Sequence, residues 1–183
     1  MTISGAWCWF SDPRAIYSPT HNSTYTGFVA TNGDVVAVQF NHATGQKTEV
    51  VLKAAFNVDD HAHPSFLEMP NGCVYVFYAR HTDSDIRFRK TGTDGDISVM
   101  SSEFTFGLPT MGLHLPGATY SYANPVFLPS CGRVMVFFRQ NRTDGTAVWF
   151  VARNEDQLAT TNFPLTYPLW HMGTGKRPYI KVM

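Results

Sequence analysis

Short runs of apolar residues alternate with turn signals along the whole chain. The two most apolar runs, Val74–Tyr78 and Val134–Phe138, have no polar face, which is typical of strands in sheets stacked between neighbouring sheets. The Asn-Gly and Asp-Gly pairs between β-rich runs are hairpin signals. We find no helical periodicity. The pattern therefore predicts an all-β protein.

The expected strands fall into three units that repeat the same order. They are Ser23–Thr31, Val35–Asn41 and Thr48–Lys53 in the first unit, Ser65–Met69, Cys73–Arg80, Asp85–Lys90 and Ile97–Met100 in the second, and Arg133–Arg139 and Thr146–Arg153 in the third.

A short phrase also returns four times, with a polar residue, a proline, a variable residue and then mostly apolar residues. Its copies are Asp12–Ile16, His63–Leu67, Asn124–Leu128 and Arg177–Lys181. The prolines stand at positions 13, 64, 125 and 178, so they are 51, 61 and 53 residues apart. This period lies in the range of propeller blades and above that of most helical repeats.

We therefore expect a β-propeller of four-stranded antiparallel blades, with a β-sandwich as the structural alternative. The blades would cover residues 10–57, 58–118 and 119–170, and residues 174–183 would begin the next one. About three blades and the first strand of a fourth make an incomplete propeller, within one partial domain that spans residues 1–183. Unpaired strand edges invite association, so self-association through these edges is expected.

Composition and charge narrow the range of partners. The 183 residues are 44% apolar, and 14 Lys plus Arg balance 14 Asp plus Glu. This balance predicts no nucleic acid and no membrane partner, and an anionic partner would be held by local cations. The amino terminus lacks the basic start and apolar stretch of a signal peptide. Three cysteines without metal spacing make a disulfide framework improbable.

Counting from each proline places polar side chains at equivalent positions on neighbouring blades. If the lead-in to each proline is extended, the residues three before, one before and one after it share a face of the innermost strand. These positions include His61 and Tyr122 three before, His63 and Asn124 one before, and Arg14 and Tyr179 one after. Arg80-His81 and Arg139 end the second strands of their units, where scaffolds often carry ligand-contacting groups.

Two histidines, a tyrosine and one or two arginines in one place fit β-elimination on a uronic acid polymer. The reaction needs a cation to neutralise the carboxylate, a base for the carbon acid and a proton donor for the leaving oxygen. Arginine suits the first role through its bidentate fork, and histidine and tyrosine suit the other two. Which of them is the base and which the acid stays open.

Other interpretations of the same residues remain. Tyr122 can be a core aromatic, and Arg139 can brace a blade. Asp59 and Asp60 can be a glycosidase acid/base pair, although adjacent residues on an extended chain point to opposite faces, which favours a loop or blade contact. Asp59, Asp60, His61 and His63 also have metal-ligand chemistry, but they match no strong zinc signature. We predict no metal and no cofactor.

Three segments carry a family resemblance: residues 5–15 (Gly-Ala-Trp-Cys-Trp-Phe-Ser-Asp-Pro-Arg-Ala), residues 59–64 (Asp-Asp-His-Ala-His-Pro) and residues 120–125 (Tyr-Ser-Tyr-Ala-Asn-Pro). The chain resembles the amino-terminal half of the BNR-repeat, seven-bladed β-propeller family that includes ulvan lyases. Strict sialidase-type Asp boxes are not present in the sequence.

The resemblance implies a lyase that acts on a sulfated polysaccharide containing uronic acid and that needs no obligatory catalytic metal. It places the catalytic roles on His61, His81, Tyr122 and Arg139, and a substrate contact on Tyr179. With the candidates above, the expected substrate-binding residues are His63, Asn124, Arg80, Tyr179 and Arg14. The resemblance also implies an extracellular protein or one on a cell or virion surface.

We therefore expect a polysaccharide lyase that cleaves an ulvan-like polymer by β-elimination. The alternatives are a glycoside hydrolase on the same scaffold and a non-catalytic glycan-binding propeller.

Overall fold

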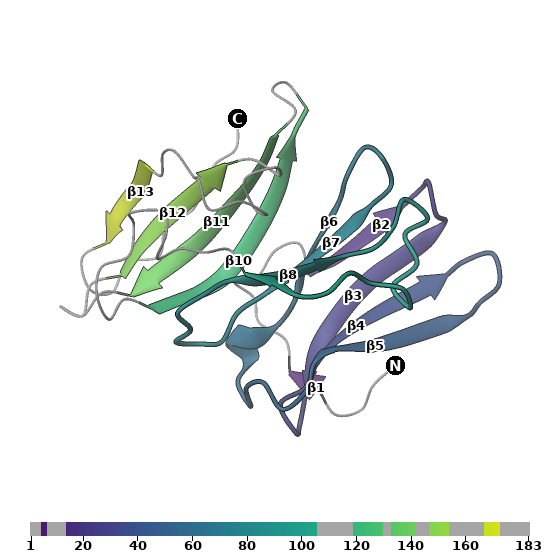
Figure 1. Ribbon diagram of the computed structural model, residues 1–183, viewed down its shortest axis with the longest axis horizontal. Coiled ribbons are helices and arrows are strands. Elements are labelled where there is room, and N and C mark those ends of the chain that lie inside the picture. Colours follow the sequence, from purple (N-terminus) through teal and green to yellow (C-terminus); the bar gives the residue numbers. More distant parts are fainter. Residues whose placement is uncertain are drawn as a thin grey trace.

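The computed structural model describes residues 5–6, 14–105, 119–129, 133–141, 147–153 and 167–172, and these residues form three antiparallel β-sheets (Figure 1). The described residues contain no α-helix, and a single 3-10 turn, η1 (Asp60–Ala62), precedes the second sheet. The fold is an incomplete β-propeller whose successive sheets are its blades, as the sequence predicts.

The first blade has four strand positions although five strands contribute to it. Its strands are β1 (Gly5–Ala6), β2 (Ala15–Ser18), β3 (Ser23–Ala30), β4 (Val35–Asn41) and β5 (Lys47–Lys53). Both β1 and β2 pair with the same edge of β3, β1 near its end and β2 near its start. Together they therefore fill one strand position of a four-stranded blade.

The second and third blades are four-stranded sheets in which each strand pairs with the next along the chain. The second blade contains β6 (Ser65–Glu68), β7 (Val74–Tyr78), β8 (Arg87–Lys90) and β9 (Phe104–Thr105). The third contains β10 (Thr119–Leu128), β11 (Arg133–Asn141), β12 (Ala147–Arg153) and β13 (Tyr167–Met172). The start of a fourth blade at residues 174–183 lies outside the described residues.

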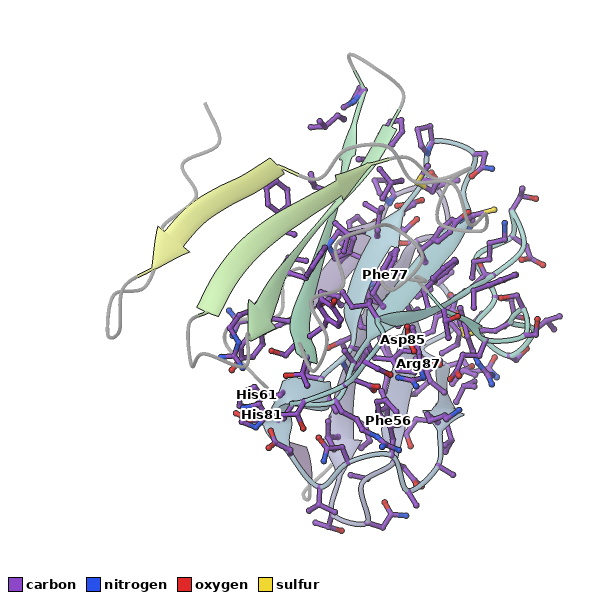
Figure 2. All side chains as sticks on the ribbon, turned by 60° about the vertical axis from the view of Figure 1, so that its left-hand side comes forward. Phe56, His61, Phe77, His81, Asp85 and Arg87 are labelled. Atoms are coloured by element: carbon purple, nitrogen blue, oxygen red, sulfur yellow. The ribbon has the colours of Figure 1, made fainter. Side chains whose placement is uncertain are left out.

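The position of strand β7 between two neighbouring blades explains why its sequence is apolar throughout. Val74, Val76 and Tyr78 belong to the core shared with the first blade, whereas Tyr75 and Phe77 belong to the core shared with the third. Side chains alternate between the two faces of a strand, so a blade packed on both sides needs apolar residues at every position. Figure 2 shows Phe77 inside this packing, with His61 and His81 side by side at some distance from it.

Two expectations about local structure are wrong. Residues 97–100 form turns, and the fourth strand of the second blade is β9. Asp side chains explain the turns: Asp94 accepts from the backbone N–H of Asp96, and Asp96 accepts from that of Ser98, and such local bonds compete with a strand ladder. Ile97 is fully buried, so its apolar character serves the core of the first two blades.

The second wrong expectation is that an extended chain leads into each proline. In the second blade the lead-in is the 3-10 turn η1, which contains His61. In the third blade it is an irregular stretch of β10, in which Tyr122 has a φ of 60°. The simple alternation of side chains therefore does not hold at either place.

No helix in the described part of the chain is long and apolar enough to cross a membrane.

Candidate active site

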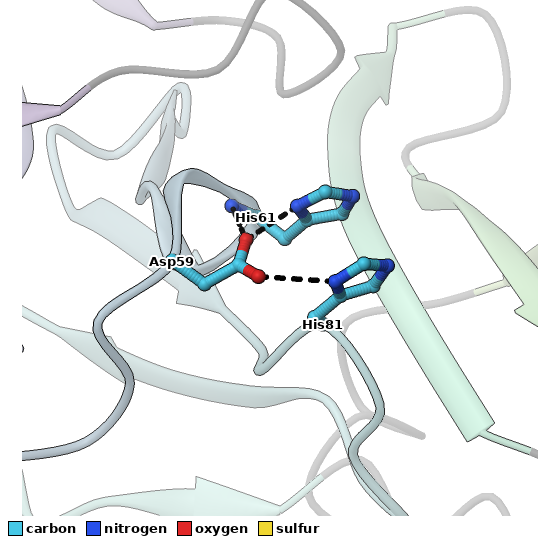
Figure 3. Close-up of side chains that lie close together, drawn as sticks. All are labelled: Asp59, His61 and His81. Carbon is cyan, nitrogen blue, oxygen red and sulfur yellow. Dashed lines mark hydrogen bonds and ion pairs between the residues drawn. The ribbon is translucent and has the colours of Figure 1, made fainter.

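The carboxylate of Asp59 contacts two histidines at the end of the second blade where β6 begins and β7 ends. Asp59 is the N-cap of η1, and its Oδ1 accepts from the backbone N–H of His61 at 2.9 Å. The same oxygen lies 2.5 Å from Nδ1 of His61, and Oδ2 lies 3.0 Å from Nδ1 of His81 (Figure 3). The N-cap residue of a single helical turn thus connects two side chains that are 20 positions apart.

The hydrogen bonds keep Asp59 ionised. Burial by itself raises the pKa of this carboxyl, but the bonds from the His61 backbone, the His61 ring and the His81 ring outweigh it and lower the pKa from 3.8 to about 2. An ionised carboxylate can only accept hydrogen bonds. Asp59 is therefore a stable acceptor for both rings at neutral pH.

The two imidazoles begin a series of stacked contacts that crosses from the second blade to the third. The rings of His61 and His81 have centroids 3.5 Å apart and an interplanar angle of 11°. The ring of Tyr122 lies 4.6 Å from that of His61, and Cζ of Arg139 lies 4.4 Å from the Tyr122 ring centroid. The four residues predicted to be catalytic are therefore neighbours, and we call them, in the order His81, His61, Tyr122 and Arg139, the stacked series.

A β-bulge directs Tyr122 toward His61. The register between β10 and β11 shifts between Ser121 and Asn124, and Tyr122 lies within this shift in the left-handed region, at φ 60°. For a residue other than glycine this conformation costs about 1–3 kcal/mol. The side-chain amide of Asn124 donates to the backbone oxygen of Tyr122 at 2.7 Å, which supports the strained peptide. Bulges often redirect a side chain beside a functional site.

Arg139 ends the series with an available donor. It faces Ser121 across the β10–β11 ladder, and its Nε is buried without a hydrogen-bond partner among the described residues. A buried polar group without a partner is rare.

The other predicted site residues lie at varied places outside the stacked series. His63 is buried at the C-cap of η1, and Asn124 supports the bulge. Arg80 is exposed, with its guanidinium 4.8 Å from the centroid of Phe56. Arg14 lies in the first blade, just before β2. Tyr179 lies outside the described residues. Substrate contact by these residues stays a prediction.

Asp59, His61 and His81 have ligand atoms close enough together to hold a metal ion, but their orientation does not suit one. A metal binds a ring nitrogen in the plane of the ring, and the planes of the two stacked imidazoles are nearly parallel. An ion between the two Nδ1 atoms would lie outside both planes. Both Nδ1 atoms also already contact Asp59. In this arrangement both Nδ1 atoms are directed at the carboxylate of Asp59.

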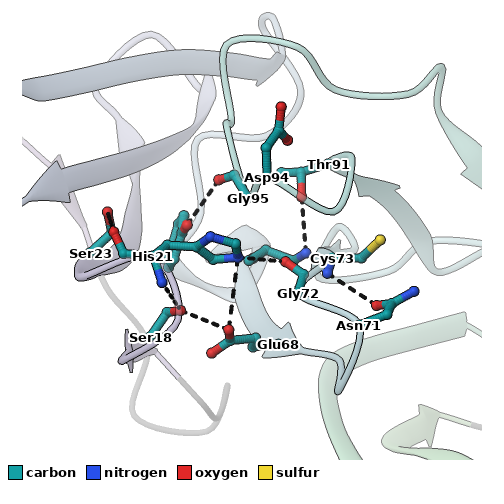
Figure 4. Close-up of polar contacts among 12 residues, drawn as sticks. Ser18, His21, Ser23, Glu68, Asn71, Gly72, Cys73, Thr91, Asp94 and Gly95 are labelled. Atoms are coloured by element: carbon teal, nitrogen blue, oxygen red, sulfur yellow. Dashed lines mark hydrogen bonds and ion pairs between the residues drawn. The ribbon is translucent and has the colours of Figure 1, made fainter.

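A second cluster of histidine and carboxylate lies at the opposite end of β6, between the first and second blades (Figure 4). Nε2 of His21 lies 2.7 Å from the backbone oxygen of Gly72 and 3.9 Å from Glu68. The hydroxyl of Ser18 donates to Glu68 at 2.7 Å and accepts from the backbone N–H of His21. We call these residues the turn-end cluster; their contacts join the β2–β3 turn to the β6–β7 turn.

Comparison with known proteins agrees with the blade architecture. Residues 23–183 match the BNR repeat-containing family, and the chain therefore belongs to this family. No curated protein matches the sequence.

Among solved structures, the chain is similar to an ulvan lyase of polysaccharide lyase family PL25, in a form bound to GlcA(1-4)Rha3S and in a second form. The TM-scores are 0.61 and 0.62, the sequence identity is 16%, and the match covers 90% of this chain and 40% of the lyase. The polysaccharide lyase Uly1 gives a TM-score of 0.57 at 10% identity, over 89% of this chain and 42% of Uly1. The chain thus has the fold of these lyases and spans about two-fifths of their length.

Proposed function

We propose that this protein is a polysaccharide lyase that cleaves a sulfated, uronic-acid-containing polysaccharide of the ulvan type by β-elimination. The observation that carries the proposal is the stacked series, which gathers two imidazoles, a phenol and a guanidinium from two blades. The fold is shared with an ulvan lyase whose bound saccharide contains glucuronate.

Each step of the reaction has a suitable group in the series. Arg139 pairs with the uronate carboxylate through its bidentate fork. A base takes the proton from the carbon beside the carboxylate, the electron pair forms a carbon–carbon double bond, and the glycosidic carbon–oxygen bond breaks. An acid then gives a proton to the leaving oxygen. His61 and Tyr122 divide the roles of base and acid.

The carboxylates near the series fit a glycoside hydrolase less well. Both oxygens of Asp59 are engaged by the histidines, and Asp60, which also contacts His61, is its direct neighbour in sequence. Glycosidases commonly place their two carboxyl groups about 5–9.5 Å apart, on either side of the scissile bond. A pair tied to the histidine rings is not arranged in this way.

The test is to incubate the full chain with ulvan and with unsulfated uronate polymers and to follow the ultraviolet absorbance of unsaturated uronate. We expect the absorbance to rise with ulvan. New reducing ends without a double bond would indicate a hydrolase, and retention of sugar without turnover would indicate a glycan-binding propeller. Either result, or no product from any uronate polymer, overturns the proposal.

A further inference from the structure

We propose that Asp59 is a positioning residue that fixes both histidines in the tautomer with a proton on Nδ1, so that Nε2 of His61 is the base of the reaction. The catalytic part of this inference rests on the proposed lyase function. The assignment of the tautomers does not, and it can be measured on the protein without substrate.

The hydrogen bonds of Asp59 determine where the ring protons lie. A neutral imidazole has one nitrogen that donates and one that accepts. Because both Nδ1 atoms face oxygens of an ionised carboxylate, at 2.5 and 3.0 Å, each Nδ1 must be the donor. Each Nε2 then has a free lone pair, and Figure 3 shows both rings with their far edges directed away from Asp59.

His61 is the better placed of the two bases. Its ring lies between His81 and Tyr122, with 17% of the side chain exposed, whereas 43% of the His81 side chain is exposed. With His61 as the base, the hydroxyl of the neighbouring Tyr122 is the group that protonates the leaving oxygen. His81 then stacks on His61 and holds its ring plane.

Asp59 is a single carboxylate that contacts two stacked rings. One carboxylate is sufficient when only one of the two rings takes up a proton during the reaction. When His61 accepts a proton, Asp59 lies beside the new positive charge and compensates it. If His81 were protonated as well, two positively charged rings would face each other with their centroids 3.5 Å apart. Asp60, whose side chain is 46% exposed, also lies 3.0 Å from Nδ1 of His61, but exposure to solvent weakens its effect.

The decisive variant is Asp59→Asn. The amide oxygen can accept from one ring, but the amide nitrogen must donate to the other and so forces its proton onto Nε2. In the serine protease triad the equivalent change lowers kcat by about 10⁴-fold. Here we expect kcat on ulvan to fall by at least about 10²-fold while KM changes by less than about 3-fold.

The structural readout is nitrogen-15 NMR of the imidazoles at neutral pH, with signals assigned through His61→Gln and His81→Gln. In the unchanged protein we expect both rings to show a protonated Nδ1 and an unprotonated Nε2. In Asp59→Asn we expect one ring to change its tautomer. A purely structural role for Asp59 would not produce this change. The matched control is Asp85→Asn, because Asp85 contacts Ser84 and lies outside the stacked series; it should alter neither readout.

Each result supports or overturns a stated part of the proposal. A protonated Nε2 on either ring of the unchanged protein, or an Asp59→Asn variant with full kcat, overturns the role of Asp59 and leaves the lyase function intact. If the unchanged protein cleaves no uronate polymer, the proposed function and the assignment of His61 as base fail, while the NMR result still decides the tautomers. If Asp59→Asn does not fold, the NMR result on the unchanged protein decides alone.

Discussion

The two ends of strand β6 each bring histidine and carboxylate together, and they do so in different ways. At one end Asp59 contacts ring nitrogens of two histidines, and both rings keep a second nitrogen on the side away from it. At the other end Glu68 accepts from a serine hydroxyl, and the ring of His21 contacts a backbone oxygen. The residue types are nearly the same, but only in the first arrangement does one carboxylate contact the Nδ1 atoms of two histidines.

The turn-end cluster is also closed by its surroundings. The His21 side chain is 10% exposed, and a Cβ added to Gly95 would lie 2.5 Å from its ring. Gly95 has a φ of 67°, so the turn both needs a glycine and leaves room for the histidine. The comparison teaches that clusters of similar residues can differ in the partner of each ring nitrogen, which is a backbone oxygen for His21 and a carboxylate for His61 and His81.

The largest expected effect separates the two clusters by activity. His61→Ala should lower kcat on ulvan by about 10²–10⁴-fold, because it removes the proposed base. His21→Ala should leave the rate per folded molecule unchanged. Initial rates of unsaturated uronate formation check both. Equal losses in the two variants would mean that the turn-end cluster takes part in the reaction.

Tyr122→Phe tests whether the series works by chemistry or by packing. The variant keeps the ring that stacks on His61 and loses only the hydroxyl, so we expect kcat to fall by about 10²-fold. The melting temperature, measured alongside, separates a loss of hydroxyl chemistry from a loss of folded protein. If the variant remains fully active, Tyr122 serves only as a packing residue and the leaving oxygen takes its proton from another source.

Arg139→Lys keeps the charge at the end of the series and removes the planar fork. We expect kcat/KM to fall by about tenfold, since lysine cannot form the bidentate pair with a carboxylate. The comparison variant is Arg80→Lys, because exposed Arg80 is another arginine expected to bind substrate. A larger loss in Arg80→Lys would move the carboxylate contact to Arg80.

His21→Ala should instead reduce stability, by about 1–3 kcal/mol, because the oxygen of Gly72 loses its partner. For a chain of this size each kcal/mol corresponds to about 2–4 °C in melting temperature, which calorimetry can measure. The control is His42→Ala, because His42 is exposed and its ring pairs with the side chain of partly buried Thr24. If both variants melt alike, the turn-end cluster does not hold the blades together.

The smallest effect concerns acid stability. The pKa of Asp59 lies at about 2 in the fold, below its ordinary 3.8, so its contribution is present above pH 3.8 and is lost as the pH falls toward 2. The stability difference between the unchanged protein and Asp59→Asn should therefore shrink as the pH falls from about 4 toward 2. Urea unfolding at several pH values checks this, and a difference that persists at pH 2 would contradict it.

The proline phrase and the apolar runs were sufficient to predict the blades, because a strand buried on both faces needs the continuous apolar sequence seen in Val74–Tyr78. The apolar pattern wrongly predicted a strand at Ile97–Met100. There a buried isoleucine lies among Asp and Ser residues whose side chains favour turns. The apolar pattern shows that a residue is buried, but it does not show whether the backbone around it is paired.

The site was also predictable only in part, because the sequence pattern indicated positions but not the backbone structure around them. Counting from the prolines found His61 and Tyr122, but η1 and the bulge bring them together, and neither is an extended strand. The contact of Asp59 with both histidine rings was not predicted. The position of Asp59 before a helical turn signals an N-cap, and this signal could have tied it to His61. Its contact with His81 depends on where β7 ends, which only the folded blade shows.

The shared carboxylate also has a consequence for how such a site is inherited. Asp59, His61 and His81 all belong to the segment around the first two strands of one blade, and Tyr122 and Arg139 belong to the next. An exchange of this segment would therefore move the carboxylate and both histidines together, and the neighbouring blade would have to supply only the phenol and the guanidinium. A graft of residues 59–81 into another blade pair would test whether the proposed chemistry moves with them.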